Sequence, residues 1–147
     1  MIKQTTSAEQ TKKLGEEMGE EILAMRKSSH AVVLGLEGEL GSGKTTFVQG
    51  LAKGLGIKER VLSPTFLVIK EFELHHTKKT MLYHIDCYRL QSPQELLDLG
   101  FKSILANPKH VVVIEWADKV AEILPKDTKW MRLSVIDENT RELDVIQ

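Results

Sequence analysis

The sequence predicts an α/β fold, a three-layer sandwich with a mixed, centrally parallel sheet and a C-terminal β-hairpin. Short apolar runs at residues 31–36, 81–86 and 111–114 are typical of buried strands. Amphipathic patterns between them indicate helices that cover the sheet. The first apolar run leads into a glycine-rich loop and then a helical pattern, which is the order found in P-loop NTPase-like domains. We expect a single domain over residues 1–147.

The first third of the chain is expected to form a helix, a strand and a second helix. Ser7 is an N-cap candidate, with Gln10 three residues later. Apolar residues then recur at four-residue spacing, at Leu14, Met18 and Ile22. After the glycine-rich loop, a second helix has one apolar face, marked by Phe47, Leu51 and Leu55. Gly54 and Gly56 are expected to end this helix.

The middle of the chain is expected to add two paired strands and a helix. Ser63-Pro64-Thr65 interrupts the chain before a strand over residues 66–72, which we pair with the strand 81–86 across a polar turn at 74–80. Phe66, Val68 and Ile69 are the residues expected to face the core. Pro93 begins a helix predicted to run through Leu105.

The last third contains the most apolar strand, Val111 to Ile114, and then a short helix from Ala117 to Leu124. Two alternating segments follow, about 130–135 and 142–146, joined by a polar turn at 137–140. This pattern predicts the C-terminal β-hairpin.

Composition and charge exclude several classes of function. The formal net charge is -1 and the pI is about 6.5, so the chain lacks the basic footprint that would draw it onto nucleic acid or an anionic membrane. Contact with RNA is therefore expected only through a partner. The single cysteine, Cys87, cannot form an intramolecular disulfide, and no signal core or run of about 18 apolar residues occurs. We expect a cytoplasmic location without membrane association.

The glycine-rich loop has the Walker A spacing, in which Gly38 and Gly43 enclose four residues and Lys44-Thr45 follows. Glycines let backbone N–H groups converge on phosphate, where the helix N-terminus adds positive potential. Lys44 is expected to neutralise the β- and γ-phosphates of ATP, and the Thr45 hydroxyl to bind Mg²⁺. The predicted nucleotide-binding residues are Gly38, Glu39, Leu40, Gly41, Ser42, Gly43, Lys44, Thr45 and Thr46.

Two carboxylates end apolar strands and are candidates for catalysis and metal binding alongside Lys44 and Thr45. Glu115 follows four apolar residues, in the manner of a Walker B acid. Glu115 either contacts Mg²⁺ through water, or orients and deprotonates the attacking water. The alternative to both roles is that Glu115 only caps the next helix. Asp86 ends the strand 81–86 and competes for the same roles, or bonds the following loop.

Other residues near these motifs have two interpretations each. Thr65 is a candidate for a switch threonine that senses the γ-phosphate, or belongs to an ordinary proline turn. Arg89 either acts as an arginine finger, which meets the charge that develops on the γ-phosphate, or forms a salt bridge. We favour the salt bridge. Trp116 approaches the nucleotide or packs. His84 is interpreted as a core histidine satisfied by a neighbour, and His75 with His76 as part of a solvated turn.

Four motifs occur together: the Walker A loop, Ser63-Pro64-Thr65-Phe66, His84-Ile85-Asp86-Cys87-Tyr88-Arg89 and Glu115-Trp116. In this order and separation they resemble the bacterial TsaE family of small P-loop ATPases over nearly the whole chain. The resemblance implies that the chain hydrolyses ATP with Mg²⁺ and acts with TsaD and TsaB in threonylcarbamoyl modification of the adenosine beside the anticodon in tRNA, which it contacts only indirectly.

The same resemblance assigns roles to residues. It places Lys44 and Thr45 at phosphate and Mg²⁺, and makes Asp86 and Glu115 the acids near the metal. Thr65 corresponds to the switch threonine. It also implies that the nucleotide base lies against the N-terminal segment and the final hairpin turn. The residues expected on that base side are Thr6, Ser7, Trp116 and Asn139.

Three rival functions are weighed against an ATPase. A small-molecule kinase would need an arginine-rich lid and an acceptor pocket, yet Arg132 and Arg141 are too scattered for a lid. A GTP-driven switch would carry Asn-Lys-x-Asp, which is absent. An interaction module regulated by nucleotide without turnover stays open. Because no lid or finger arginine is evident, we expect slow hydrolysis by the isolated chain.

Overall fold

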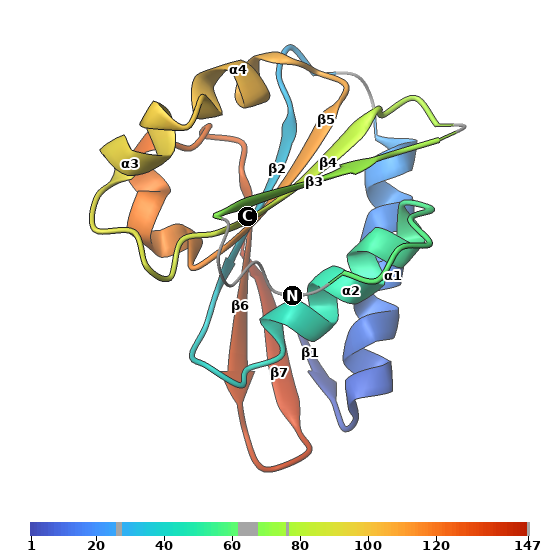
Figure 1. The fold of residues 1–147 in the computed structure, drawn as a ribbon. Helices are drawn as coiled ribbons and strands as arrows, with labels where there is room; N and C mark the ends of the chain where they lie inside the picture. The colour runs from blue at the N-terminus through green and yellow to red at the C-terminus, as the bar shows by residue number, and fades with distance from the viewer. Residues whose placement is uncertain (26–27, 62–67, 76, 147) are drawn as a thin grey trace.

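A computed structural model of the chain describes residues 1–25, 28–61, 68–75 and 77–146. In this part of the chain one sheet contains seven strands, in the order β1-β7-β6-β2-β5-β4-β3. The strands are β1 (Ile2–Thr5), β2 (Val32–Glu37), β3 (Ile69–Glu73), β4 (Met81–Asp86), β5 (His110–Glu115), β6 (Lys129–Val135) and β7 (Arg141–Ile146). Figure 1 shows this sheet between two groups of helices.

The four central strands are parallel: β2 pairs with both β5 and β6, and β4 pairs with β5. The outer pairs, β3 with β4, β6 with β7 and β1 with β7, are antiparallel. Parallel strands are buried on both faces, and β2 and β5 are accordingly almost entirely apolar and buried. The predicted mixed, centrally parallel sheet and its C-terminal β-hairpin are confirmed.

Helices α1 (Ala8–Ala24) and α2 (Lys44–Gly54) cover one face of the sheet. As predicted, Ser7 caps α1, and its side chain accepts a hydrogen bond from the backbone N–H of Gln10 at 3.1 Å. The buried face of α1 differs from the expected one, because Leu14 and Met18 are only partly buried. Ile22 is buried as expected, and the other buried residues of α1 are Thr11, Gly15 and Gly19.

Glycines explain this shift of the buried face. A Cβ on Gly15 would lie 2.1 Å from the carbonyl oxygen of Phe47, and one on Gly50 would lie 1.8 Å from that of Lys12. The backbones of α1 and α2 therefore touch, with no room for a side chain between them. Gly54 is the last residue of α2, as expected, and also lies against α1 at Glu16.

The other face of the sheet carries short helices, α3 (Pro93–Asp98), α4 (Phe101–Ala106) and the 3₁₀ helix η1 (Ala117–Ile123). The single helix predicted from Pro93 through Leu105 was wrong, since the chain divides at Gly100. This glycine has φ +89°, a left-handed conformation that ends α3 and caps α4. The segment from Ala117 is helical as expected, but of the tighter 3₁₀ type.

Two edge strands depart from the expectations. β1 was not predicted, because its residues are exposed except Thr5 and show no apolar alternation. β3 begins at Ile69, while Phe66 of the predicted strand lies outside the described residues. Phe72 is the buried residue of β3, and Ile69 is only half-buried. Within the described residues, no helix is long and apolar enough to cross a membrane.

Candidate functional site

Three parallel strands bring the predicted motifs to one edge of the sheet. The loop that begins at Gly38 follows β2, Glu115 ends β5 and Asp86 ends β4. In the strand register, Glu115 lies opposite Leu36 of β2 on one side and Asp86 of β4 on the other. The carboxyl ends of parallel strands are where α/β folds bind ligands.

A cavity of about 610 Å³ opens at this edge. Its walls are the glycine-rich loop, the first turns of α2 and α1, the ends of β4 and β5 and the β6–β7 turn. Segments that are far apart in the chain therefore share one site. The volume falls within the range of small-molecule pockets.

The glycine-rich loop has a backbone that only glycine adopts easily. Gly43 has φ +98° at the start of α2, and a Cβ on Gly38 would lie 2.4 Å from the carbonyl oxygen of Leu133. No side chain of the described residues caps the N-terminus of α2. The first backbone N–H groups of this eleven-residue helix thus keep their positive potential for an anion in the cavity.

Lys44 is 5% exposed and folds back onto its own loop. Its Nζ donates hydrogen bonds to the carbonyl oxygens of Gly38 and Glu39, the latter at 2.8 Å, and lies 4.2 Å from the ring centroid of Trp116. Burial lowers the pKa of Lys44, against the opposing influence of Glu115 and other nearby carboxylates. Among the described residues, no carboxylate forms an ion pair with this ammonium group.

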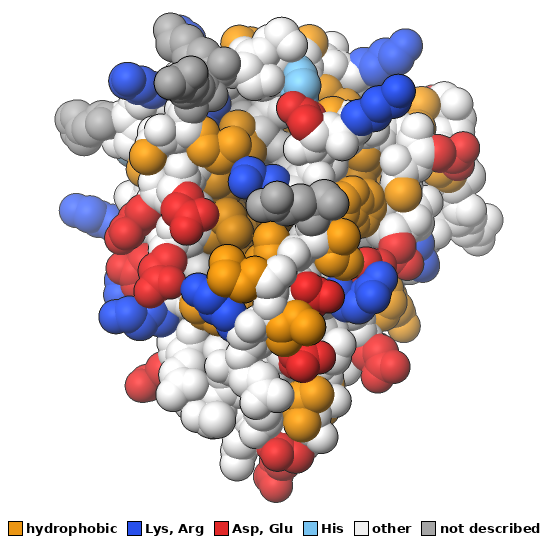
Figure 2. All heavy atoms as spheres, turned by 180° about the vertical axis from the view of Figure 1, so that it is seen from behind, with side chains coloured by type: hydrophobic (Ala, Val, Ile, Leu, Met, Phe, Trp, Pro, Cys, Tyr) orange, Lys and Arg blue, Asp and Glu red, His pale blue; other side chains and the backbone are white. Residues whose placement is uncertain are grey.

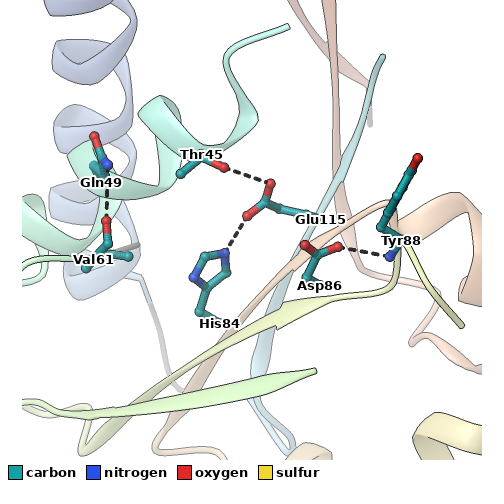
Figure 3. Close-up of polar contacts among 7 residues, drawn as sticks. All are labelled: Thr45, Gln49, Val61, His84, Asp86, Tyr88 and Glu115. Carbon is teal, nitrogen blue, oxygen red and sulfur yellow. Dashed lines mark hydrogen bonds and ion pairs between the residues drawn. The ribbon is translucent and has the colours of Figure 1, made fainter. Parts of the chain in front are cut away.

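The two acids differ in their surroundings (Figure 3). Glu115 is 3% exposed, and both of its carboxylate oxygens are engaged. Its Oε1 accepts a hydrogen bond from the Thr45 hydroxyl at 3.2 Å, and its Oε2 lies 2.5 Å from Nε2 of His84. Asp86 is half-buried, and its Oδ1 accepts the backbone N–H of Tyr88 at 2.9 Å.

This donor set fits a magnesium-bound nucleotide. Buried Lys44 and the first N–H groups of α2 suit phosphate, while a hydroxyl and two carboxylates are the oxygen ligands that Mg²⁺ prefers. The Thr45 hydroxyl already touches Glu115. The described residues contain no group of three or more His, Cys, Asp or Glu side chains that holds a metal by itself. A site that shares its ion with the phosphates needs no such group.

The residues expected on the base side are only partly brought together. Ser7, Trp116 and Asn139 line the cavity, as does Arg89. Thr6 is not among the lining residues, and its backbone N–H and hydroxyl both donate to Oε1 of Gln10. Arg89 forms no ion pair among the described residues. Thr65 and the rest of Ser63-Pro64-Thr65-Phe66 lie outside the described residues.

Several residues that line the cavity were not expected from the sequence, among them Arg141 of β7 and Thr11 of α1. Arg141 donates from Nε to the carbonyl oxygen of Gly41 at 3.1 Å and from Nη1 to that of Asp137 at 2.9 Å, so it ties the hairpin turn to the glycine-rich loop. Thr11 lines the cavity from the first turns of α1. No motif marks either residue. The pairing of β6 with β2 brings the hairpin to this edge, and no sequence signal showed that pairing.

Comparison with known proteins gives a consistent result. The family model described as "Threonylcarbamoyl adenosine biosynthesis protein TsaE" matches residues 5–143. A Treponema pallidum protein named "tRNA threonylcarbamoyladenosine biosynthesis protein TsaE" is 42% identical over 77% of this chain and 80% of its own length. A Nostoc protein of the same name is 40% identical over 93% and 80%. The crystal structure of Bacillus subtilis YdiB superposes with a TM-score of 0.73 at 32% identity, over 99% of this chain and 83% of the other.

Proposed function

The chain belongs to the TsaE family, and from this premise we propose that it is a Mg²⁺-dependent ATP hydrolase. Its role is in threonylcarbamoyl modification of the adenosine beside the anticodon in tRNA, where it acts with TsaB and TsaD. The observation that carries the proposal is the hydrogen bond of Thr45 with Glu115, which joins the first turn of α2 to the end of β5 beside buried Lys44.

Phosphate binding is assigned to the start of α2. Among the described residues, the partners of the Lys44 ammonium group are oxygens of its own loop and the Trp116 ring. This group can therefore exchange the carbonyl oxygens of Gly38 and Glu39 for phosphate oxygens. An ionised partner makes a stronger hydrogen bond than a neutral carbonyl, which favours this exchange. The N–H groups at the start of α2 add to the attraction.

Thr45, Glu115 and Asp86 are the residues that would hold Mg²⁺ in this site. When bound, the ion supplies charge neutralisation at the phosphates. We assign the water-activating role to Glu115, because it is the more buried of the two acids and is held by contacts from α2 and β4. A carboxylate in this position accepts the proton of the attacking water.

Partners are proposed to complete the site and to contact the tRNA. Arg89 lines the cavity without an ion pair among the described residues, so it is available to meet phosphate charge once a partner orders its loop. Acidic and basic side chains alternate over the surface in Figure 2, with no broad basic face in that view. A chain with a net charge of -1 is poorly suited to grip tRNA by itself.

Substitution of the acid tests the proposal most directly. Glu115→Gln is expected to bind MgATP with near wild-type affinity and to lose single-turnover hydrolysis by roughly 10²- to 10⁴-fold, because the amide cannot take a proton. Calorimetry and rapid-quench kinetics measure the two effects. Lys44→Ala is the matched control, since it should lose affinity for ATP instead. Wild-type hydrolysis by the Glu115 variant would give the role to another residue.

The contribution of the partners is tested by phosphate release from the chain alone, with TsaB plus TsaD, and with tRNA added to each. We expect slow turnover alone and strong activation in the complex, because finger arginines supplied on assembly accelerate such hydrolases by roughly 10³- to 10⁵-fold. Fast turnover that is indifferent to the partners would contradict activation by assembly.

A further inference from the structure

We propose that His84 is a positioning residue for Glu115: its imidazole fixes Oε2 of the carboxylate, so that Oε1 alone is left to serve the cavity beside Thr45. The inference deepens the proposed function and rests on it, since it concerns how the acid of that same site is held. The sequence by itself predicts no more for His84 than a core histidine satisfied by a neighbour. The neighbour is the acid itself.

The strand geometry makes this contact. His84 pairs with Val113 of β5, and Asp86 pairs with Glu115. Successive side chains of a strand alternate between its faces, so Val113 and Glu115 point to the same side of β5, as His84 and Asp86 do on β4. The imidazole therefore stands next to the carboxylate, one residue pair deeper in the sheet (Figure 3).

Burial makes the contact a strong constraint. The His84 side chain is 0% exposed and the Glu115 side chain 4% exposed, and their polar atoms are 2.5 Å apart. A hydrogen bond between a carboxylate and a donor away from water is among the stronger ones in proteins. With Oε2 engaged in this way and Oε1 next to the Thr45 hydroxyl at 3.2 Å, rotation of the carboxylate would break two contacts at once.

The second ring nitrogen, Nδ1, argues against a role of His84 in packing alone. Nδ1 is buried and has no hydrogen-bond partner among the described residues. An unsatisfied buried polar atom carries the full cost of its desolvation, which a leucine in the same space would avoid. The imidazole places Nε2 toward Glu115 and has no other polar contact in the described part of the chain. The donor at Nε2, assigned from this geometry, is what the residue provides.

Three substitutions at one position separate positioning from packing. His84→Gln keeps an N–H donor at about the reach of Nε2, His84→Asn carries the same amide one methylene shorter, and His84→Leu fills the space without a donor. We expect kcat for ATP to fall about 10- to 100-fold in the Leu and Asn variants with KM little changed, and to be largely kept in the Gln variant. If the Leu variant does not fold, the Gln and Asn variants carry the test.

A double variant tests whether His84 acts through the acid. In a Glu115→Gln chain, His84→Leu should reduce turnover no further, because the group that it positions is already gone. Crystal structures of the apo variants add a readout that needs no activity: the contact of Thr45 with Oε1 should be lost in His84→Leu and kept in His84→Gln.

The outcomes distinguish the two proposals. Equal turnover in the Gln and Asn variants, an additive loss in the double variant, or a Glu115 carboxylate that stays in place in the His84→Leu crystal structure would each overturn the positioning role. A wild-type chain that binds no MgATP, or binds it without hydrolysis, would instead overturn the proposed ATPase. In that case the crystal structures still decide whether His84 holds Glu115.

Discussion

The two faces of the sheet differ although the same strands build both. Alternate residues of β4 and β5 point to opposite sides, one toward α1 and α2 and the other toward α3, α4 and η1. Toward α1 and α2 lie the side chains Leu82, His84, Val111, Val113 and Glu115. Toward the other helices lie Tyr83, Ile85, Val112 and Ile114. A polar site thus continues directly from the apolar core on one face, while the other face is packing throughout.

The two layers of helices also differ in how they are packed. α1 and α2 meet backbone to backbone at four glycines, Gly15, Gly19, Gly50 and Gly54. The opposite layer is filled by large buried side chains, among them Leu96, Phe101 and Val120. Backbone contact leaves no rotamers to adjust, so α2 has one position against α1. We infer that this contact fixes the start of α2, and with it Lys44 and Thr45.

The largest expected effect is on stability, and it comes from a methyl group added between α1 and α2. In Gly50→Ala the Cβ would lie 1.8 Å from the backbone carbonyl oxygen of Lys12, and the two helices must separate to admit it. Such overpacking against backbone is expected to cost about 4 kcal/mol or more, a large part of the stability of an ordinary domain. Urea denaturation measures the loss.

The matched control is Gly100→Ala in the opposite layer. A Cβ there meets nothing within 4 Å, and only the φ of +89° opposes it. The expected cost is about 1–2 kcal/mol. Equal losses in the two variants would mean that the backbone contact of α1 with α2 is not the tighter of the two layers.

The second prediction compares neighbouring valines of β5 that point to opposite faces. Val112 and Val113 are both fully buried, so Val112→Ala and Val113→Ala should each lose about 2 kcal/mol of stability. Only Val113 shares a face with Glu115 and pairs with His84. The proposed ATP turnover should therefore fall in Val113→Ala and stay near wild type in Val112→Ala. A matching fall in both would contradict the functional division of the faces.

The motifs that build the site could be predicted from the sequence for specific reasons. The loop after β2 and the acids at the ends of β4 and β5 follow from apolar runs that end in a glycine-rich or acidic residue, which is a local signal. Because parallel strands have their carboxyl ends at one edge, three separate motifs become one site.

What could not be predicted depends on contacts across the chain. Arg141 reaches Gly41 only because β6 lies beside β2, and no periodicity reports which strands become neighbours. The buried face of α1 includes Gly15 and Gly19, and the periodicity of apolar residues does not reveal them. His84 and Glu115 are 31 positions apart, so their contact depends on the register of two strands.

The third prediction concerns Trp116, where the two faces meet. Its ring packs with the core of the second face, lies 5.1 Å from that of Tyr88, and covers the Lys44 ammonium group at 4.2 Å. If Lys44 exchanges its loop contacts for phosphate, this cation–π contact, worth about 0.5–2 kcal/mol, must change. Nucleotide is therefore expected to alter the fluorescence of Trp116.

The chain has two tryptophans, which gives a matched pair for that measurement. Trp130→Phe leaves Trp116 as the only indole and should keep the signal, while Trp116→Phe should lose it. A response that persists in Trp116→Phe, at nucleotide concentrations that saturate wild type, would place the change elsewhere in the molecule.

The smallest expected effect lies outside both faces, in the β6–β7 turn. The Asp137 carboxylate accepts backbone N–H groups of Asn139 and Thr140 at 3.0 and 2.9 Å, and its hydrogen bonds with Thr140 and Asn139 lower its pKa from the ordinary value of 3.8. A lowered pKa means that the folded chain holds the ionised form more readily than the unfolded chain. The stabilisation is therefore complete above pH 3.8 and is lost as the pH falls through the folded value.

In Asp137→Ala we expect a small fall in Tm at pH 7 that shrinks steadily toward acid, measured by thermal unfolding across this range. Nucleotide affinity should be unchanged, because Arg141 holds the turn through the backbone carbonyl of Asp137 and not through its side chain. A loss of stability that is the same at pH 7 and in acid would assign the role of Asp137 to the conformation of the turn instead of its charge.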